Sequence, residues 1–175
     1  PHALEGLRLA NALWNYFDLR GFDILDWLEK GLALLQGEAP EQVKARAKAY
    51  LIKGYKFAWT GQYIEARHWL IESIKLSRAS GDRSILAFAL AYLGYFSAQI
   101  IPLNSTSPDY DQAWQMLNES EAILREQGYN WELAEVLHYK NGTAILQKDS
   151  ASALNFWKES IAILQKIGDR LHCTF

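Results

Sequence analysis

Apolar residues recur along this chain with the spacing of helix faces, and no segment sustains the apolar–polar alternation of a strand. The pattern predicts eight helices and therefore an all-α fold. Their expected bounds are about 3–19, 22–36, 41–60, 62–79, 83–101, 108–127, 131–147 and 150–167.

A short motif of large apolar, acidic and small residues appears four times. Its copies are Trp27-Leu28-Glu29-Lys30-Gly31, Trp69-Leu70-Ile71-Glu72-Ser73, Met116-Leu117-Asn118-Glu119-Ser120 and Phe156-Trp157-Lys158-Glu159-Ser160. They begin 42, 47 and 40 residues apart, so the chain is a repeat with a period of that size.

Residues typical of helix ends keep the same register. A glycine stands eight residues after the motif's serine in three copies, at Gly81, Gly128 and Gly168, where it predicts a C-cap with positive φ. Ser107 and Pro108 predict the N-cap and first residue of the sixth helix, with Asp109 as an acid in its first turn.

Each motif follows another helical pattern, so the repeating unit is a helical hairpin. Small or polar residues are expected to face each other where its two helices meet, in the pairs Gly54 and Ala66, Gly94 and Ala113, Asn141 and Ala153. The chain thus reads as one repeat domain with hairpins at about 3–36, 41–79, 83–127 and 131–167. Because it starts at Pro1 and 169–175 repeat the beginning of a hairpin, we expect a piece of a longer protein with a truncated fifth repeat.

The last helix carries two apolar stripes at 100° per residue. We expect the first stripe to cover the preceding helix, and the second to lack a partner within the chain. The first contains Leu154, Trp157, Ile161 and Leu164; the second contains Phe156, Ile163 and Ile167. The second stripe predicts self-association.

These hairpins resemble the tetratricopeptide repeat. The second repeat carries the resemblance best, and the third shares it through Leu90, Leu93, Gly94, Ala113 and Leu117; the second shows Tyr50, Gly54, Phe57, Gly61, Tyr63, Ala66 and Leu70. The first repeat departs from the pattern with Trp14 and Asp26, the period exceeds the usual 34 or so residues, and the closing proline is absent. The resemblance implies a right-handed α-α superhelix. The long units with Gly-Asp-Arg are similar to sensor repeats of bacterial signalling ATPases and maltose-activator-like transcription regulators, which implies signalling or transcription regulation in the cytoplasm.

Composition and motifs exclude several kinds of chemistry. With 18 Lys and Arg against 20 Asp and Glu, the net charge of -2 argues against nucleic acid as a direct partner. The uncharged stretch from Arg83 to Asp109 is interrupted by polar residues and glycine, which predicts a buried helix and not a membrane span. There is no phosphate loop, nucleophile elbow or His-Glu-x-x-His, and the four histidines are scattered. We therefore expect no catalytic residues, metal or cofactor; Cys173 is expected to be structural.

The candidate site is a concave groove. In tetratricopeptide arrays the first helix of each hairpin lines such a groove, so the resemblance implies the set Asn11, Asn15, Lys48, Tyr55, Trp59, Phe88, Tyr95, Gln99, Glu135 and His138. The aromatic members suit a protein or peptide, or a small organic ligand. The competing interpretation is that they fill the interior of the superhelix.

Three functions remain open. The leading hypothesis is a non-catalytic interaction or ligand-sensing domain of a larger regulator. The second is a structural spacer or oligomerisation segment that uses the repeat ends. The third is a small all-helical hydrolase, which a cluster of ionisable groups around His138 would favour.

Overall fold

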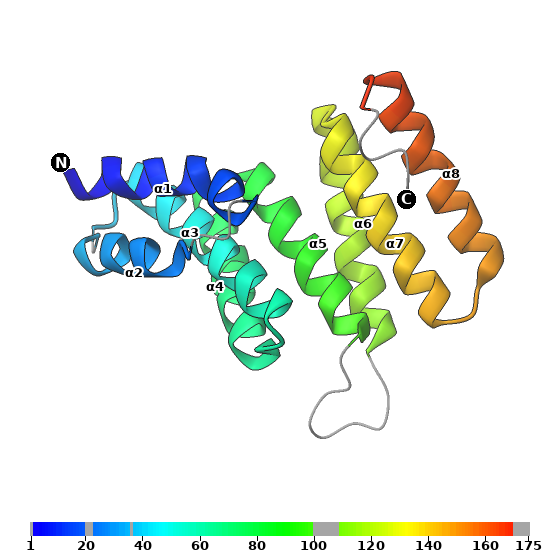
Figure 1. Cartoon of the computed structure of the whole chain (residues 1–175), viewed down its shortest axis with the longest axis horizontal. Coiled ribbons are helices and arrows are strands. Elements are labelled where there is room, and N and C mark those ends of the chain that lie inside the picture. The colour runs from blue at the N-terminus through cyan, green and yellow to red at the C-terminus, as the bar shows by residue number, and fades with distance from the viewer. Residues whose placement is uncertain (1, 20–22, 36, 100–108, 170–175) are drawn as a thin grey trace. The chain divides into compact units, whose positions relative to one another are not determined.

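The computed structural model describes residues 2–19, 23–35, 37–99 and 109–169, and for 15–19 it describes the backbone alone. Within these ranges the protein is all-α, with eight helices and no strand (Figure 1). They are α1 (His2–Leu19), α2 (Leu25–Leu34), α3 (Pro40–Trp59), α4 (Tyr63–Ser80), α5 (Arg83–Gln99), α6 (Tyr110–Gln127), α7 (Asn130–Leu146) and α8 (Ser150–Lys166). The predicted fold class is confirmed, and each helix end lies within three residues of its expected position.

The chain forms two compact units, residues 1–89 and 90–175, and α5 contributes to both. In the first unit α1 packs on α2 and α3, and α3 packs on α4. In the second unit α7 packs on both α6 and α8, and Figure 1 shows these three helices side by side. Consecutive helices therefore pair as hairpins, while the right-handed superhelix stays a prediction.

The serine at the end of the repeated motif uses its hydroxyl group to join the two helices of a hairpin. The Ser73 Oγ donates to the carbonyl oxygen of Ala47 at 2.8 Å, joining α4 to α3. The Ser160 Oγ donates to that of Ala134 at 2.8 Å, joining α8 to α7 in the same way. Both serines are buried, so a larger side chain here would force the helices of a hairpin apart.

Glycine brings the paired helices into close contact. A Cβ on Gly54 would lie 2.6 Å from the Leu70 Cγ, so the atoms nearest to this position belong to Leu70, while the contact with Ala66 one turn earlier stays a prediction. The branched side chain of Leu70 fills the space that the missing Cβ of Gly54 leaves. In the third hairpin a Cβ on Gly94 would lie 3.0 Å from the carbonyl oxygen of Ala113, which confirms that pair.

Positive backbone φ angles mark the predicted helix ends. Gly81 and Gly128 are C-caps with φ of 69° and 71°, and Gly168 directly follows the cap of α8 with φ of 76°. The C-caps at Gly81 and Gly128 are confirmed, and at Gly168 the positive φ is confirmed while the cap is the residue before it. A side chain is disfavoured at positive φ and glycine is not.

Aspartates cap the starts of three helices. At the start of α5, the Asp82 carboxylate accepts a hydrogen bond from the backbone N–H of Ile85 at 2.9 Å. The Asp109 carboxylate accepts a hydrogen bond from the backbone N–H of Gln112 at 3.0 Å, and Asp149 accepts one from Ser152 at 3.1 Å. The prediction of Ser107 as the cap of α6 is therefore wrong, and Ser107 itself lies outside the described residues. A carboxylate satisfies the free N–H groups and also interacts favourably with the helix dipole.

The rotation of α8 about its axis differs from the predicted one. Leu154 and Trp157, expected to cover the preceding helix, are 49% and 40% exposed. The buried side of α8 instead contains Ala153, Ser160 and Leu164. The hydrogen bond of Ser160 to α7 fixes this rotation, so Leu154 and Trp157 of the first apolar stripe face outward, whereas Leu164 of the same stripe is buried.

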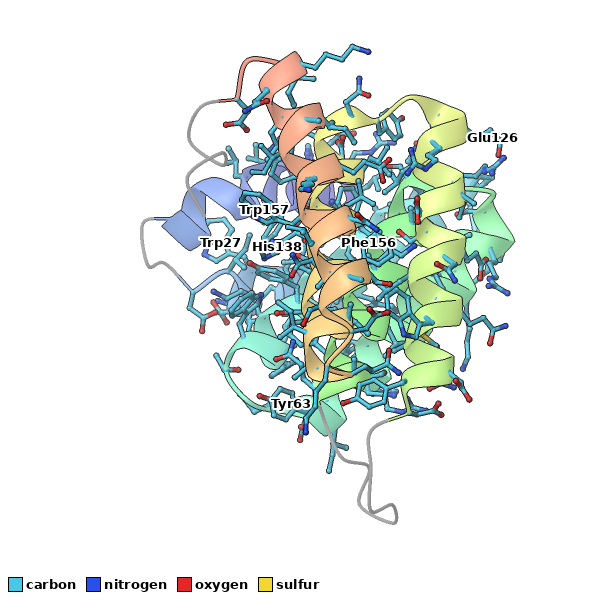
Figure 2. The ribbon with its side chains drawn as sticks, turned by 90° about the vertical axis from the view of Figure 1, so that its right-hand side faces the viewer. Trp27, Tyr63, Glu126, His138, Phe156 and Trp157 are labelled. Atoms are coloured by element: carbon cyan, nitrogen blue, oxygen red, sulfur yellow. The ribbon has the colours of Figure 1, made fainter. Side chains whose placement is uncertain are left out.

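The stripe predicted to be unpaired has partners. The Phe156 ring lies 5.8 Å from the Trp114 ring and 4.6 Å from the Lys140 Nζ, and Ile163 is half-buried. Of the three residues, Ile167, just past the helix, is the one that is exposed, at 41%. Figure 2 shows Phe156 and Trp157 on different sides of the α8 ribbon. Phe156 is therefore not unpaired as predicted, while self-association through Phe156, Ile163 and Ile167 stays a prediction.

Candidate functional site

The predicted site residues do lie on the first helices of the four hairpins. The first unit holds those of α1, α3 and the start of α5, and the second holds those of the end of α5 and of α7. In the first unit they are Asn11, Lys48, Tyr55, Trp59 and Phe88; in the second they are Tyr95, Gln99, Glu135 and His138. The side chain of Asn15 lies outside the described part.

Three aromatic rings form a continuous row in the first unit. The Trp14 ring of α1 meets the Tyr55 ring of α3 edge-on, with centroids 5.1 Å apart and planes at 75°. The Tyr55 ring lies 5.9 Å from that of Trp59, one turn further along α3. These are favourable geometries for aromatic pairs. Trp14 was not among the predicted site residues, although a tryptophan where the repeat usually has glycine could have signalled it.

A lysine ammonium completes this row. The Lys48 Nζ lies 6.0 Å from the Trp14 ring centroid and 5.6 Å from that of Phe88 on α5, within the range of cation–π attraction. Residues from three first helices therefore converge here. We call Trp14, Lys48, Tyr55, Trp59 and Phe88 the aromatic cluster.

The aromatic cluster is open at one end. Trp59 exposes 61% of its surface, whereas Tyr55, Trp14, Lys48 and Phe88 are half-buried. A tryptophan side chain with this exposure contributes little to the stability of the folded protein, because its stabilising free energy comes from burial. The exposed Trp59 agrees with the open alternative for the predicted groove and the half-buried Tyr55 does not, so the choice between an open groove and a filled interior stays a prediction.

The predicted site residue Asn11 links two helices of the first unit by a hydrogen bond. It is 9% exposed, and its Nδ2 donates to the carbonyl oxygen of Ala45 at 3.0 Å, linking α1 to α3. Its Oδ1 is buried and accepts no hydrogen bond from the described residues. Asn141 on α7 donates to the carbonyl oxygen of Ala153 on α8 at 3.3 Å, which confirms the predicted contact of that pair.

Aromatic residues of the second unit pack together instead of lying open. The Tyr95 and Tyr139 rings stack with centroids 4.6 Å apart and planes at 27°, and the Tyr92 ring meets Tyr139 edge-on at 5.8 Å. Tyr92 and Tyr139 are buried. A Cβ on Gly142 would lie 3.2 Å from the Tyr95 Cε2, so glycine provides the room for that ring. Here the predicted groove residue Tyr95 is part of a filled interior.

The remaining predicted residues of the second unit do not converge. The Tyr139 hydroxyl donates to Glu135, so that carboxylate is used within α7. His138 and Gln99 are exposed, and the His138 ring lies 6.3 Å from that of Tyr139 (Figure 2). Across the described ranges, no three His, Cys, Asp or Glu residues come together as metal ligands.

Two buried lysines were not predicted. Lys53 on α3 is 4% exposed; its Nζ lies 3.3 Å from the Glu29 carboxylate of α2 and 3.7 Å from the Trp69 ring of α4. Lys140 on α7 is 6% exposed, pairs with Glu121 of α6, and lies over the Phe156 ring of α8. The lysines stand directly before Gly54 and Asn141, so their equivalent places in the repeat were the available signal.

Electrostatics favour the charged form of the Lys140 partner. Burial alone raises the pKa of Glu121, but hydrogen bonds and charges from Lys140 and Arg125 outweigh it and lower that pKa below its usual value. A hydrogen bond to Glu159 raises the pKa of Arg125, which also pairs with Glu121. This network joins α6, α7 and α8.

No helix in the described ranges has the length and hydropathy that a bilayer crossing requires. No protein-family model matches the chain, and no curated protein matches it.

Proposed function

We propose that this chain is a non-catalytic helical-repeat module that binds an extended protein segment on the aromatic cluster of its first unit. The observation that carries the proposal is the exposed ring of Trp59, continuous through Tyr55 with Trp14, on first helices held together by hairpin packing. Large, rigid aromatic side chains supply binding area with little loss of conformational freedom.

The positions along α3 indicate the chemistry of the ligand. At 1.5 Å per residue, Tyr55 and Trp59 stand roughly 10 and 16 Å from Lys48. An extended peptide covers that distance in about three to five residues. We therefore expect a segment with an acidic residue near Lys48 and an apolar or aromatic residue about three to five positions away, near Trp59.

The regulatory context of this proposal rests on the resemblance to tetratricopeptide sensor repeats. A module that binds without reacting would report the presence of a protein or inducer to other parts of a regulator, which is how the resemblance suggests the chain works in signalling or transcription. Because the second unit buries Tyr92 and Tyr139, the proposed site is limited to the first unit.

Peptide selection tests this function. Peptides of about twelve residues, long enough to cover the cluster when extended, are selected from a random library on the immobilised chain. Affinity for the selected peptides is then measured by isothermal titration calorimetry. Trp59→Ala is expected to weaken binding by more than about tenfold, with helix content unchanged in circular dichroism, because an exposed ring contributes to binding and not to folding.

Trp27→Ala is the matched control, since Trp27 is 65% exposed on α2 and lies outside the aromatic cluster. It should leave peptide affinity within about twofold of wild type. The proposal fails if no peptide is selected, if both variants lose affinity equally, or if Trp59→Ala binds like wild type.

A further inference from the structure

The structure aligns the first, second and fourth hairpins residue by residue, and the repeated motif aligns α6 with α8 through Ser120 and Ser160. Ser73 bonds to Ala47 and Ser160 bonds to Ala134, so these pairs are equivalent. In the first hairpin a Cβ on Gly31 would lie 2.9 Å from the Leu7 Cδ1. The pair of Gly31 and Leu7 is therefore equivalent to the two serine–alanine pairs. In this register, position 7 of α1 corresponds to position 47 of α3 and 134 of α7.

The first hairpin exposes positions that later hairpins bury. Leu9 is 59% exposed, whereas its equivalents Ala49 and Val136 are at most 1% exposed. Leu13 is 37% exposed, and it corresponds to the two buried lysines of α3 and α7. Trp27 on α2 is 65% exposed, and its equivalents on α4 and α8 are half-buried. We call Leu9, Leu13 and Trp27 the first end face.

Contacts inside each unit show what covers this face in the other hairpins. Lys53 reaches back to Glu29, on the second helix of the preceding hairpin. Lys140 reaches back to Glu121 in the same way. In the second and fourth hairpins, the positions equivalent to the first end face therefore lie against the second helix of the preceding hairpin.

The last hairpin exposes the complementary positions. Trp114 of α6 packs on Phe156, and the equivalent of Trp114 on α8 is Leu154, 49% exposed. The equivalent of Glu121 on α8 is the half-buried Ile161. Trp157 lies between these two residues on α8 and is 40% exposed. At the equivalent position, α2, α4 and α6 each carry a fully buried leucine. We call Leu154, Trp157 and Ile161 the second end face.

The two end faces match in chemistry. At the two internal junctions described above, a carboxylate on the earlier helix neutralises a buried lysine on the later one. The first end face has Leu13 at the lysine position, and the second has Ile161 at the position of Glu121. The first end face therefore brings no lysine that would need a carboxylate, and the second end face offers no carboxylate that would need a lysine. A hairpin that placed a lysine against α8 would instead bury an unpaired charge at high cost.

We propose that the second end face binds the first end face of another copy of this chain, head to tail, with Leu154 near the partner copy's Trp27 in the way that Trp114 packs on Phe156. Such a heterologous contact repeats from copy to copy, so association continues beyond a pair of copies. With few large side chains on each face, the association should be weak, in the range of about 10 µM to 1 mM.

Sedimentation equilibrium of the chain over this concentration range tests the inference. The average mass of the wild type should rise from the 20.0 kDa of one copy past that of two copies. Leu13→Glu on one face, or Trp157→Glu on the other, should each stop growth. Both residues are partly exposed, so both variants should keep wild-type helix content in circular dichroism.

Mixing the two variants gives the decisive result. Each retains one intact face, so the mixture should form a one-to-one pair that does not grow further. Trp59→Glu, which alters an exposed tryptophan that belongs to neither face, should associate like wild type. The inference is overturned by a wild type that stays monomeric, by variants that still grow, or by a mixture that does not pair. These outcomes are independent of peptide binding to the aromatic cluster.

Discussion

Lys53 and Lys140 show how single residues join one hairpin to the next. Each ammonium lies between a carboxylate on the preceding hairpin and an aromatic ring in its own hairpin. The charge is thereby neutralised on one side and attracted to a π-face on the other. Composition alone did not reveal this role, because a lysine within a helix is usually at the surface.

Removing the partner of Lys140 should destabilise the protein. Glu121→Gln leaves a buried ammonium facing an uncharged amide, so we expect the free energy of unfolding to fall by about 1–3 kcal/mol at neutral pH. Urea unfolding followed by circular dichroism measures the change. Because the pKa of Glu121 is lowered in the folded protein, its stabilising contribution is present above the usual carboxyl pKa. It is lost as pH falls through the folded pKa.

The difference between wild type and Glu121→Gln should therefore be constant near neutral pH and shrink in acid. Glu126→Gln is the control, since Glu126 is exposed at the end of α6 (Figure 2) and should change stability by less than about 0.5 kcal/mol. A loss for Glu121→Gln that stays the same in acid would show that its charge is not the cause.

At the scale of elements, sequence periodicity predicted the helices but not the rotation of the last one. Glycine caps and apolar spacing give helix ends directly, because they depend on local backbone conformation. The rotation of α8 depends on Ser160 reaching a carbonyl of α7, a contact between helices. Both stripes of α8 carry large apolar residues, so hydrophobicity did not distinguish Phe156 from Trp157.

Close packing within a hairpin leads to a test at Gly54. Gly54→Ala would place a methyl group 2.6 Å from the Leu70 Cγ, so it should lower the free energy of unfolding by about 1–3 kcal/mol despite the better helix propensity of alanine. Gly6→Ala on α1 is the matched control, because no atom lies within 4 Å of the added Cβ. It should stabilise by up to about 1 kcal/mol, measured by thermal unfolding. Equal effects of both substitutions would contradict the packing described for the second hairpin.

At the scale of the molecule, the candidate site was predicted only in part. The placement of Tyr55, Trp59 and Lys48 on one helix follows from periodicity. The meeting of Lys48 with Trp14 and Phe88 requires the packing of three helices, which a single sequence does not give. Tyr95 was assigned to an open groove, but in the second unit it stacks on Tyr139.

Ligands are proposed to bind at the aromatic cluster of the first unit. Indole N–H signals in a proton–nitrogen NMR spectrum test this proposal most directly, because each of the 7 tryptophans gives its own signal. Titration with a selected peptide should shift the signals of Trp14 and Trp59 and leave that of Trp157 on α8 in place. Shifts confined to Trp157 or to Trp131 on α7, with Trp14 and Trp59 unchanged, would contradict the account.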